Sequence, residues 1–155
     1  PEAVVEVLDW GALAAAAEAV GVARSLLETT VAYVSERRQF GRPVGANQAV
    51  KHSCADVAIA VEFARPVVAM AAWSMAKGRS PTEGGTVSGD VSMAKALASD
   101  AVDHACRSAL QCHGAIGYTI EHDLQLWLKR GWALSATWGD AAHHRRRLAQ
   151  LLGLG

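Results

Sequence analysis

Two short polar clusters in the sequence carry residue types that could bind a ligand, and the first lies between Glu36 and Pro43. Arg37 can bind a phosphate through paired N–H donors, and Phe40 can stack on a flat ring. Gly41 and Pro43 break the preceding helical pattern, so these side chains are expected at an exposed helix end. Taken alone, the segment is equally well explained as an ordinary basic helix terminus.

The second cluster runs from Gln111 through Gly114 and Ala115 to Gly117. It again joins an amide side chain to glycines at the end of a helical pattern. Glycine leaves the backbone uncovered, so a ligand can approach it closely. Two such clusters in a helical protein favour one shared, nucleotide-like ligand.

Other reactive residues are arranged less specifically. His143 and His144 are adjacent, so on a helix they point about 100° apart and do not converge on one metal ion. A solvated basic helix end after Asp140 is the preferred interpretation, and no metal site is predicted. Cys112 beside His113 could form a nucleophile, but a small buried thiol is preferred. Three cysteines without a CxxC pair favour free thiols in a reducing compartment.

The composition describes one folded domain with no charge bias. Of the 155 residues, 51% are hydrophobic and 19% charged, and 15 basic residues balance 15 acidic ones. This balance gives no electrostatic reason to expect nucleic acid or an anionic membrane as partner. No apolar run approaches the roughly 18 residues of a membrane-spanning helix, and no signal segment is present, so a cytoplasmic protein is predicted. The start at Pro1 is interpreted as that of a piece of a longer protein.

Apolar spacing of three and four residues predicts helices, with too few alternating stretches for a sheet. Asp9 is the expected N-cap of the first helix, Asn47 begins the second, and Pro66 is expected to kink the second without ending it. The chain should have helices at about 10–40, 47–77, 90–110, 124–129 and 139–152, an exposed loop at 77–89 and a turn at 114–117. The prediction is an all-α, up-and-down bundle forming a single domain of residues 1–155.

The same spacing predicts which side chains face inward on the first and third helices. The expected inward residues are Leu13, Ala17, Val20, Leu27, Val31 and Val34, and then Val91, Ala94, Ala98, Val102, Ala105 and Ala109. Alanine-rich faces let helix axes approach closely. Five tryptophans among so many alanines suggest that some large side chains serve an interface.

Both polar clusters resemble the C-terminal helical domain of the acyl-CoA dehydrogenase family, and the resemblance covers essentially the whole chain. The family pattern Tyr-x-x-x-Arg-x-Gln-Phe-Gly-x-Pro with a later Gln is matched. So is Gln-x-x-Gly-Gly-x-Gly-Tyr/Phe, except that Ala115 replaces one glycine. The matching residues are Tyr33, Arg37, Gln39, Phe40, Gly41, Pro43, Gln48, Gln111, Gly114, Gly117 and Tyr118.

The resemblance implies a subunit with an N-terminal helical domain, a middle β domain and this bundle, in which FAD lies across a subunit interface. Arg37 would contact the FAD pyrophosphate, Phe40 and Gln48 would flank the adenosine half, and Gln111 with the backbone around Gly114 would hold the same region. The full set expected to bind FAD is Arg37, Gln39, Phe40, Gln48, Gln111, Gly114 and Ala115. The substrate would be an acyl-CoA thioester, and without the β domain this chain alone is predicted to be inactive.

The resemblance also shows what is missing. The family's catalytic base is a Glu before the last helix or, in some members, a Glu on the first helix of this domain followed by a CoA-binding Arg. Trp138 and Gly11 occupy these two base positions, and Ala12 occupies that of the Arg. Indole cannot accept a proton at neutral pH. Asp140 remains a weak alternative, and Glu18 lies nearly two helical turns beyond Gly11.

These losses suggest a base-deficient subunit that assembles with an active paralogue, as in the heterotetrameric dehydrogenases of actinobacterial steroid side-chain breakdown. A homo-oligomer with an unusual base is the alternative within the family. A flavin-dependent monooxygenase of the same fold, or a purely structural oligomerisation module, are the other readings. The acyl chain length and the choice between a homomeric and a heteromeric dimer-of-dimers stay open.

Overall fold

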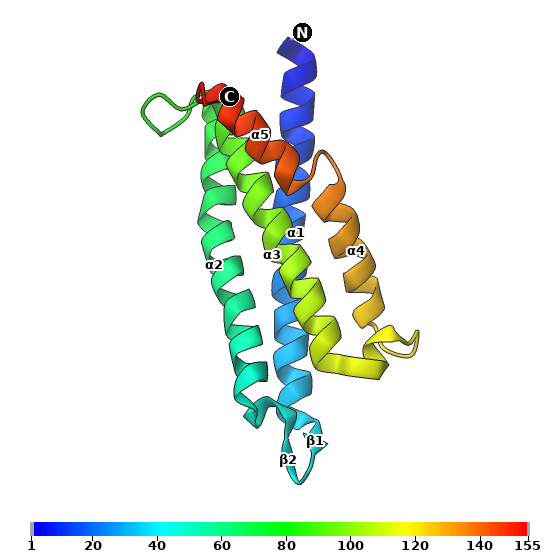
Figure 1. Cartoon of the computed structure of the whole chain (residues 1–155). Helices are drawn as coiled ribbons and strands as arrows, with labels where there is room; N and C mark the ends of the chain where they lie inside the picture. The colour runs from blue at the N-terminus through cyan, green and yellow to red at the C-terminus, as the bar shows by residue number, and fades with distance from the viewer. Residues whose placement is uncertain (1, 155) are drawn as a thin grey trace.

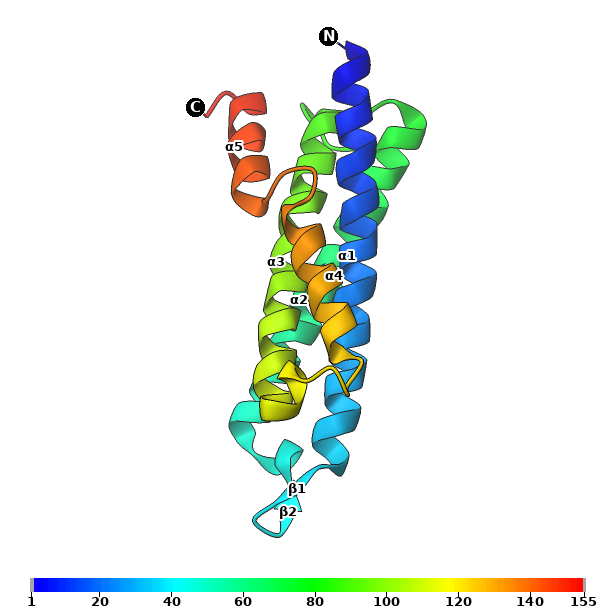
Figure 2. The same ribbon diagram turned by 90° about the vertical axis from the view of Figure 1, so that its right-hand side faces the viewer.

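The computed structural model describes residues 2–154 and confirms the all-α bundle (Figure 1). Its elements are α1 (Glu2–Glu36), β1 (Arg38–Gln39), β2 (Arg42–Pro43), η1 (Val44–Ala46), α2 (Gln48–Lys77), α3 (Val87–His113), η2 (Gly114–Tyr118), α4 (Leu124–Ala136) and α5 (Ala141–Leu151), where η marks a 3-10 helix. The three long helices lie side by side, and α4 lies along α1 and α3 (Figures 1 and 2). The short α5 packs on α3 at the end opposite the β1–β2 hairpin.

Small side chains fill the core between α1, α2 and α3. All six residues expected to face inward on the third helix are buried, which confirms its predicted face. On the first helix, however, Ala17 and Val31 are exposed. Both line open grooves between α1 and α2, because these two helices do not close over their full length. Along residues 2–154, no helix combines the length and the apolar character needed to cross a membrane.

The first helix is longer at its start than expected, and Asp9 is not its N-cap. Since α1 begins at Glu2, Asp9 lies two turns inside the helix, where it is 3% exposed. Its carboxylate accepts hydrogen bonds from Arg147 of α5 and Ser88 of α3, at 2.5 Å each. Asp9 is therefore buried by contacts with residues far away in the sequence, and the local spacing of apolar residues does not predict such contacts.

Two residues after α1 ends, the chain forms a two-stranded hairpin that the sequence did not predict. Arg38 pairs with Pro43 and Gln39 with Arg42, leaving Phe40 and Gly41 as the two-residue turn. Both turn residues have positive φ, +51° and +80°, as the right-handed twist of a tight hairpin requires. Glycine adopts this conformation freely, whereas for a phenylalanine it is strained.

The remaining differences concern helix ends. The loop predicted at 77–89 spans only 78–86, because Thr86 Oγ1 caps α3 by accepting from Gly89 N at 3.0 Å. The turn predicted at 114–117 is the 3-10 helix η2. Asn47 does precede α2, but its side chain accepts from Arg42 (2.7 Å) and makes no capping bond. As expected, α2 continues through Pro66.

The fourth helix runs to Ala136, well past the predicted end at 129. Gly131 lies inside it at the contact with α3. A Cβ at this position would lie 2.5 Å from Cys106 Sγ and 3.0 Å from Val102 Cγ2. The glycine therefore allows close packing of α4 on α3 and does not end the helix.

Candidate functional site

The two predicted ligand-binding clusters lie at the same end of the bundle. The first forms the hairpin after α1, and the second spans the end of α3 and the start of η2 (Figure 1). An aromatic contact ties these segments together: the Tyr33 ring of α1 stacks on His113 of α3, with 4.3 Å between centroids and an 18° interplanar angle. His122 packs edge-on against His113 at 5.1 Å. Stacked rings make the relative position of the two clusters rigid.

Every residue expected to bind FAD is exposed at this end, namely Arg37, Gln39, Phe40, Gln48, Gln111, Gly114 and Ala115. Phe40 is fully exposed, at 100%, on its strained turn. Arg37 forms no ion pair with any residue in 2–154. An uncovered aromatic ring next to an unpaired guanidinium suits a ligand with an anionic part and a flat part.

Gly114 provides an open backbone position where α3 ends and η2 begins. Its φ of +62° favours glycine, and a Cβ built on it would meet nothing within 4 Å. The space in front of this backbone is therefore free for a ligand. The exposed Phe40, the unpaired Arg37 and the open Gly114 together fit a dinucleotide such as FAD.

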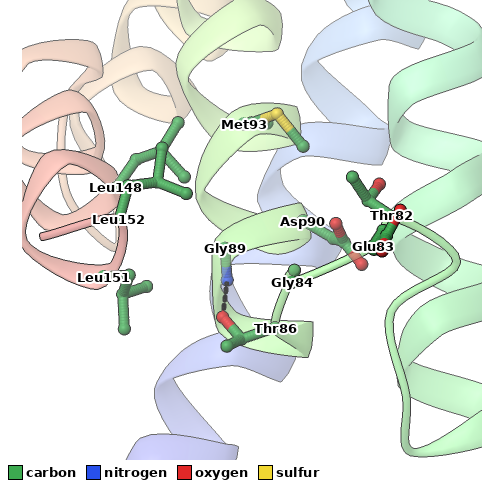
Figure 3. Close-up of a pocket in the computed structure, with 11 residues that line it drawn as sticks. Thr82, Glu83, Gly84, Thr86, Gly89, Asp90, Met93, Leu148, Leu151 and Leu152 are labelled. Carbon is green, nitrogen blue, oxygen red and sulfur yellow. Dashed lines mark hydrogen bonds between the residues drawn. The ribbon is translucent and has the colours of Figure 1, made fainter.

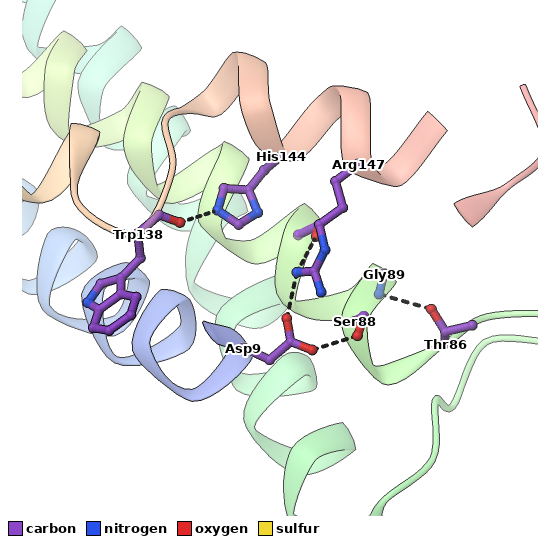
Figure 4. Close-up of polar contacts among 8 residues, drawn as sticks. Asp9, Thr86, Ser88, Gly89, Trp138, His144 and Arg147 are labelled. Atoms are coloured by element: carbon purple, nitrogen blue, oxygen red, sulfur yellow. Dashed lines mark hydrogen bonds and ion pairs between the residues drawn. The ribbon is translucent and has the colours of Figure 1, made fainter. Parts of the chain in front are cut away.

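The two residues that the resemblance places at the family's base positions are in contact with each other at a second place in the fold. The indole of Trp138, on the loop between α4 and α5, lies against α1 (Figure 4). Its ring atoms are the ones that a side chain at Gly11 of α1 would meet. A Cβ at Gly11 would lie 2.5 Å from the indole Cδ2 and Cε2 atoms, so a side chain there is excluded while the indole stays in place. Trp138 itself has a φ of +60°, which is strained for a bulky residue.

A buried lysine that sequence reasoning missed holds the loop carrying Trp138. Lys95 of α3 is 0% exposed, and its Nζ donates to Gly139 O (2.8 Å), Ser135 O (3.2 Å) and Ser99 Oγ (2.7 Å). Burial lowers its pKa to about 8, opposed by the nearby Asp140 carboxylate. The sequence pattern could have revealed that Lys95 is buried, because this residue falls on the inward face of the third helix between apolar neighbours.

His144 holds the same loop from α5. It is 2% exposed, so the prediction that it belongs to a solvated basic helix end was wrong. Its Nε2–H donates to Trp138 O at 2.9 Å (Figure 4). Burial lowers the pKa of His144, against the opposing effect of this bond, and so favours the neutral ring. Within residues 2–154, no three His, Cys, Asp or Glu side chains are placed to hold a metal ion.

A third contact fixes α5 itself against α1 and α3. Arg147 Nη1 donates to Asp9 Oδ1 at 2.5 Å and to Ser92 Oγ at 3.3 Å (Figure 4). The Asp9 side chain is only 4% exposed, so this ion pair is almost wholly shielded from water on its Asp9 side. The loop carrying Trp138 is thus held by Lys95 of α3. On its C-terminal side it is held by α5, which the Asp9–Arg147 pair fixes in place.

We expect Arg147→Met to lower the free energy of unfolding by about 2 kcal/mol, because it leaves a buried carboxylate with only a hydroxyl donor. Urea unfolding followed by circular dichroism measures this change. Arg146→Met is the matched control, since Arg146 is exposed on the same helix. An effect of Arg147→Met no larger than that of the control would contradict a structural role for the Asp9–Arg147 pair.

The residues considered as alternative bases or nucleophiles have structural contacts or pKa shifts that disfavour those roles. Asp140 caps α5: its Oδ1 accepts from His143 N at 2.7 Å, and this bond holds its pKa below the usual range. Glu18 forms a bidentate ion pair with Arg130, whose Nε and Nη2 donate to Oε1 and Oε2 at 2.5 and 2.6 Å. Burial raises the pKa of the Cys112 thiol, which disfavours the thiolate. Neither carboxylate has the raised pKa of a general base, and the Cys112 thiol is not activated as a nucleophile.

A separate pocket of about 210 Å³ lies between the α2–α3 loop, the start of α3 and the end of α5 (Figure 3). Met93, Leu148 and Leu152 make it mostly apolar. Its buried acid, Asp90, already accepts a hydrogen bond from Ser74 Oγ at 2.6 Å. The pocket touches neither the hairpin end nor the contact between Gly11 and Trp138.

Comparisons with known proteins agree with the geometry. Residues 2–153 match the family model for the acyl-CoA dehydrogenase C-terminal domain. The chain is 39% identical over 140 residues to the acyl-CoA dehydrogenase IpdE2 of Mycolicibacterium smegmatis, covering 90% of this chain and 42% of that protein. Among the first curated relatives, the chain spans 20% to 42% of their length.

Solved structures show the same fold. The ChsE4–ChsE5 complex from Mycobacterium tuberculosis superposes with a TM-score of 0.87 at 27% identity, covering 96% of this chain and 39% of that one. PigA with FAD and proline gives a TM-score of 0.84 at 26% identity, covering 95% and 37%. From its sequence match and its fold, this chain belongs to the acyl-CoA dehydrogenase C-terminal domain family.

Proposed function

We propose that this chain is the C-terminal domain of an FAD-dependent acyl-CoA dehydrogenase-like subunit that helps to bind FAD held mainly by a neighbouring subunit. In the full subunit, an N-terminal helical domain and a middle β domain precede it. Its own acyl-CoA site lacks a base, and an active paralogous subunit supplies the chemistry. The family membership, the exposed hairpin end and the Trp138–Gly11 contact support this proposal.

The observation that carries the proposal is the distance between the two sites on α1. Gly11 and Arg37 are 26 residues apart along a helix that ends at Glu36, which separates them by about 39 Å at 1.5 Å per residue. FAD is too short to reach from the hairpin end to the base positions of the same chain. The FAD bound at the hairpin end therefore serves an active site to which another subunit contributes the base.

Each residue of the hairpin end has a physical role in this arrangement. Arg37 pairs with the pyrophosphate, and the Phe40 ring, with Gln39 and Gln48 beside it, covers the adenosine half. On the other side, Gln111 donates or accepts through its amide, and the uncovered backbone at Gly114 and Ala115 lets the cofactor lie close. FAD bound there would supply the acceptor for the hydride from the β-carbon of an acyl-CoA. The hairpin end only binds and orients it.

Loss of the base explains why this subunit needs a partner. The indole of Trp138 fills the place where a carboxylate would remove the α-proton, and Gly11 has no side chain to replace it. Asp140 is a cap with a lowered pKa. The similarity to a chain of the ChsE4–ChsE5 complex supports an assembly of two different subunits.

We expect Arg37→Ala and Gln111→Ala each to reduce flavin retention at least tenfold in the assembly of the full-length subunit with its paralogue. The readout is the visible flavin absorbance per subunit after gel filtration. Arg38→Ala is the matched control, because Arg38 is an equally exposed neighbour outside the set expected to bind FAD. Unchanged flavin content in both variants would overturn the shared FAD site.

A further inference from the structure

The pocket at the end of the bundle opposite the hairpin has one polar and one apolar side, and the proposed function does not use it. It encloses about 210 Å³ between the α2–α3 loop, the start of α3 and the end of α5. In Figure 3, Leu148 and Leu151 lie on one side of it, and Asp90, Thr82 and Glu83 lie on the other. Walls of this kind suit a ligand with an apolar body and one polar end.

Asp90, on the polar side, is a buried acid without a basic partner. It is 1% exposed, and within residues 2–154 it forms no ion pair. Its Oδ2 accepts from Ser74 Oγ at 2.6 Å, but this hydroxyl has a single hydrogen and also lies 3.1 Å from Arg79 O. The N-terminus of α3 offsets only part of the charge. By contrast Asp9, buried to a similar extent, is paired with Arg147, so Asp90 lacks the partner that a buried carboxylate normally has.

The charges of the lining residues determine which ligands fit. Among the 11 described residues that line the pocket, Glu83 and Asp90 are acidic and none is basic, so a cation is favoured over an anion. The Thr86 hydroxyl is already used, because it caps α3. A guanidinium has five N–H donors in one plane and would leave several of them unbonded here. The three donors of an ammonium group match the carboxylates of Asp90 and Glu83 and the hydroxyl of Thr82.

The volume of the pocket limits the apolar part of the ligand. An apolar cavity of about 150 Å³ binds benzene, so a body of roughly eight non-hydrogen atoms is expected to fit here. Met93 and Leu148 supply apolar contacts for it. Gly89 leaves the space between them open, because a Cβ at this position would already lie 3.6 Å from Leu148 Cδ1.

We propose that this pocket binds a primary ammonium ion with an apolar body of that size. The ammonium group pairs with Asp90, and the body lies between Met93 and the leucines at the end of α5. The inference does not rest on the shared FAD site, because the hairpin lies at the other end of the bundle (Figure 1). Since the ligand contacts both the α2–α3 loop and α5, it stabilises their packing on α3.

The first test compares phenethylammonium chloride with its neutral counterpart 2-phenylethanol on the 155-residue chain. We expect the ammonium compound to bind saturably with a Kd below about 1 mM, and the alcohol to bind at least tenfold more weakly. The readout is the shift of the backbone amide signals of Gly84, Gly85 and Gly89, which line the pocket, in heteronuclear NMR spectra. No saturation at ten times that concentration, or equal binding of the alcohol, would overturn the proposal.

The second test assigns the charge preference to Asp90. Asp90→Asn removes the charge and keeps an oxygen that can accept from Ser74. We expect it to weaken binding of phenethylammonium at least tenfold and to change binding of the alcohol less than twofold. Asp56→Asn is the matched control, because Asp56 is exposed on α2 and does not line the pocket.

Circular dichroism verifies that the variants fold. If Asp90→Asn does not fold, Met93→Trp takes its place, because the larger side chain fills the pocket and should abolish binding of both compounds. Equal weakening by Asp56→Asn and Asp90→Asn would mean that the ammonium ion is attracted to surface acids in general, and it would contradict the proposal. Binding that persists in Met93→Trp would contradict it as well.

Discussion

Replacing Lys95 with methionine is expected to lower the free energy of unfolding by about 3 kcal/mol at pH 7. The lysine donates to two buried carbonyls, Gly139 O and Ser135 O, and a methionine of similar length leaves both without this donor. Because these carbonyls belong to the end of α4 and the loop before α5, the loss also frees the segment carrying Trp138. Lys129→Met is the control, since Lys129 is exposed and bonds only to Gln125.

The pH dependence gives Lys95 a signature that simple loss of packing would not show. In the folded chain its pKa is lowered to about 8, against 10.5 for an ordinary lysine, so between these values the unfolded chain binds more protons. The contribution of Lys95 to the free energy of unfolding should therefore rise with pH through this window, by up to about 1.4 kcal/mol per pH unit. The cysteines, whose pKa values burial raises, oppose this slope equally in both proteins, so urea unfolding at about pH 8 and pH 10 should show the stability of the wild type rising relative to that of Lys95→Met. A rise of equal size in both would mean that another group causes it.

Gly11→Ala is expected to cost about 2 kcal/mol, although alanine normally stabilises a helix relative to glycine. The added Cβ would lie 2.5 Å from two carbons of the Trp138 indole, so the ring has to leave its place. Gly21, on the same helix, has nothing within 4 Å of an added Cβ, and Gly21→Ala should be neutral or slightly stabilising.

A double-mutant cycle attributes this cost to the indole. In a Trp138→Gly background, which also removes the strained φ of +60°, Gly11→Ala should have its ordinary stabilising effect. Chemical unfolding of the four proteins of the cycle measures the coupling. A Gly11→Ala cost that persists without the indole would contradict the contact. The same clash explains why one chain cannot carry a side chain at Gly11 together with the indole in this position.

The sequence by itself determined the helical elements and located the two polar clusters that are expected to bind a ligand. Spacing of apolar residues at three and four positions is a local property, and it identified the buried face of α3 without knowledge of its neighbours. Arg37 and Phe40 could be found because Gly41 and Pro43 follow them closely, and Gln111 because Gly114 ends α3 three residues later. The hairpin was missed because Phe40 is an unusual residue for a turn with positive φ.

Only the tertiary structure decided the roles of isolated polar residues and the contact between Gly11 and Trp138. Asp9 and His144 have sequence surroundings typical of a cap and of a solvated helix end, yet both are buried by groups far away in the chain: Arg147 for Asp9, and Trp138 O for His144. Gly11 and Trp138 are 127 residues apart, and their contact depends on how α4, α5 and the buried Lys95 place one loop against α1. Helix formation follows from neighbours in the chain, whereas the burial of a single charge or ring depends on which distant surfaces close over it.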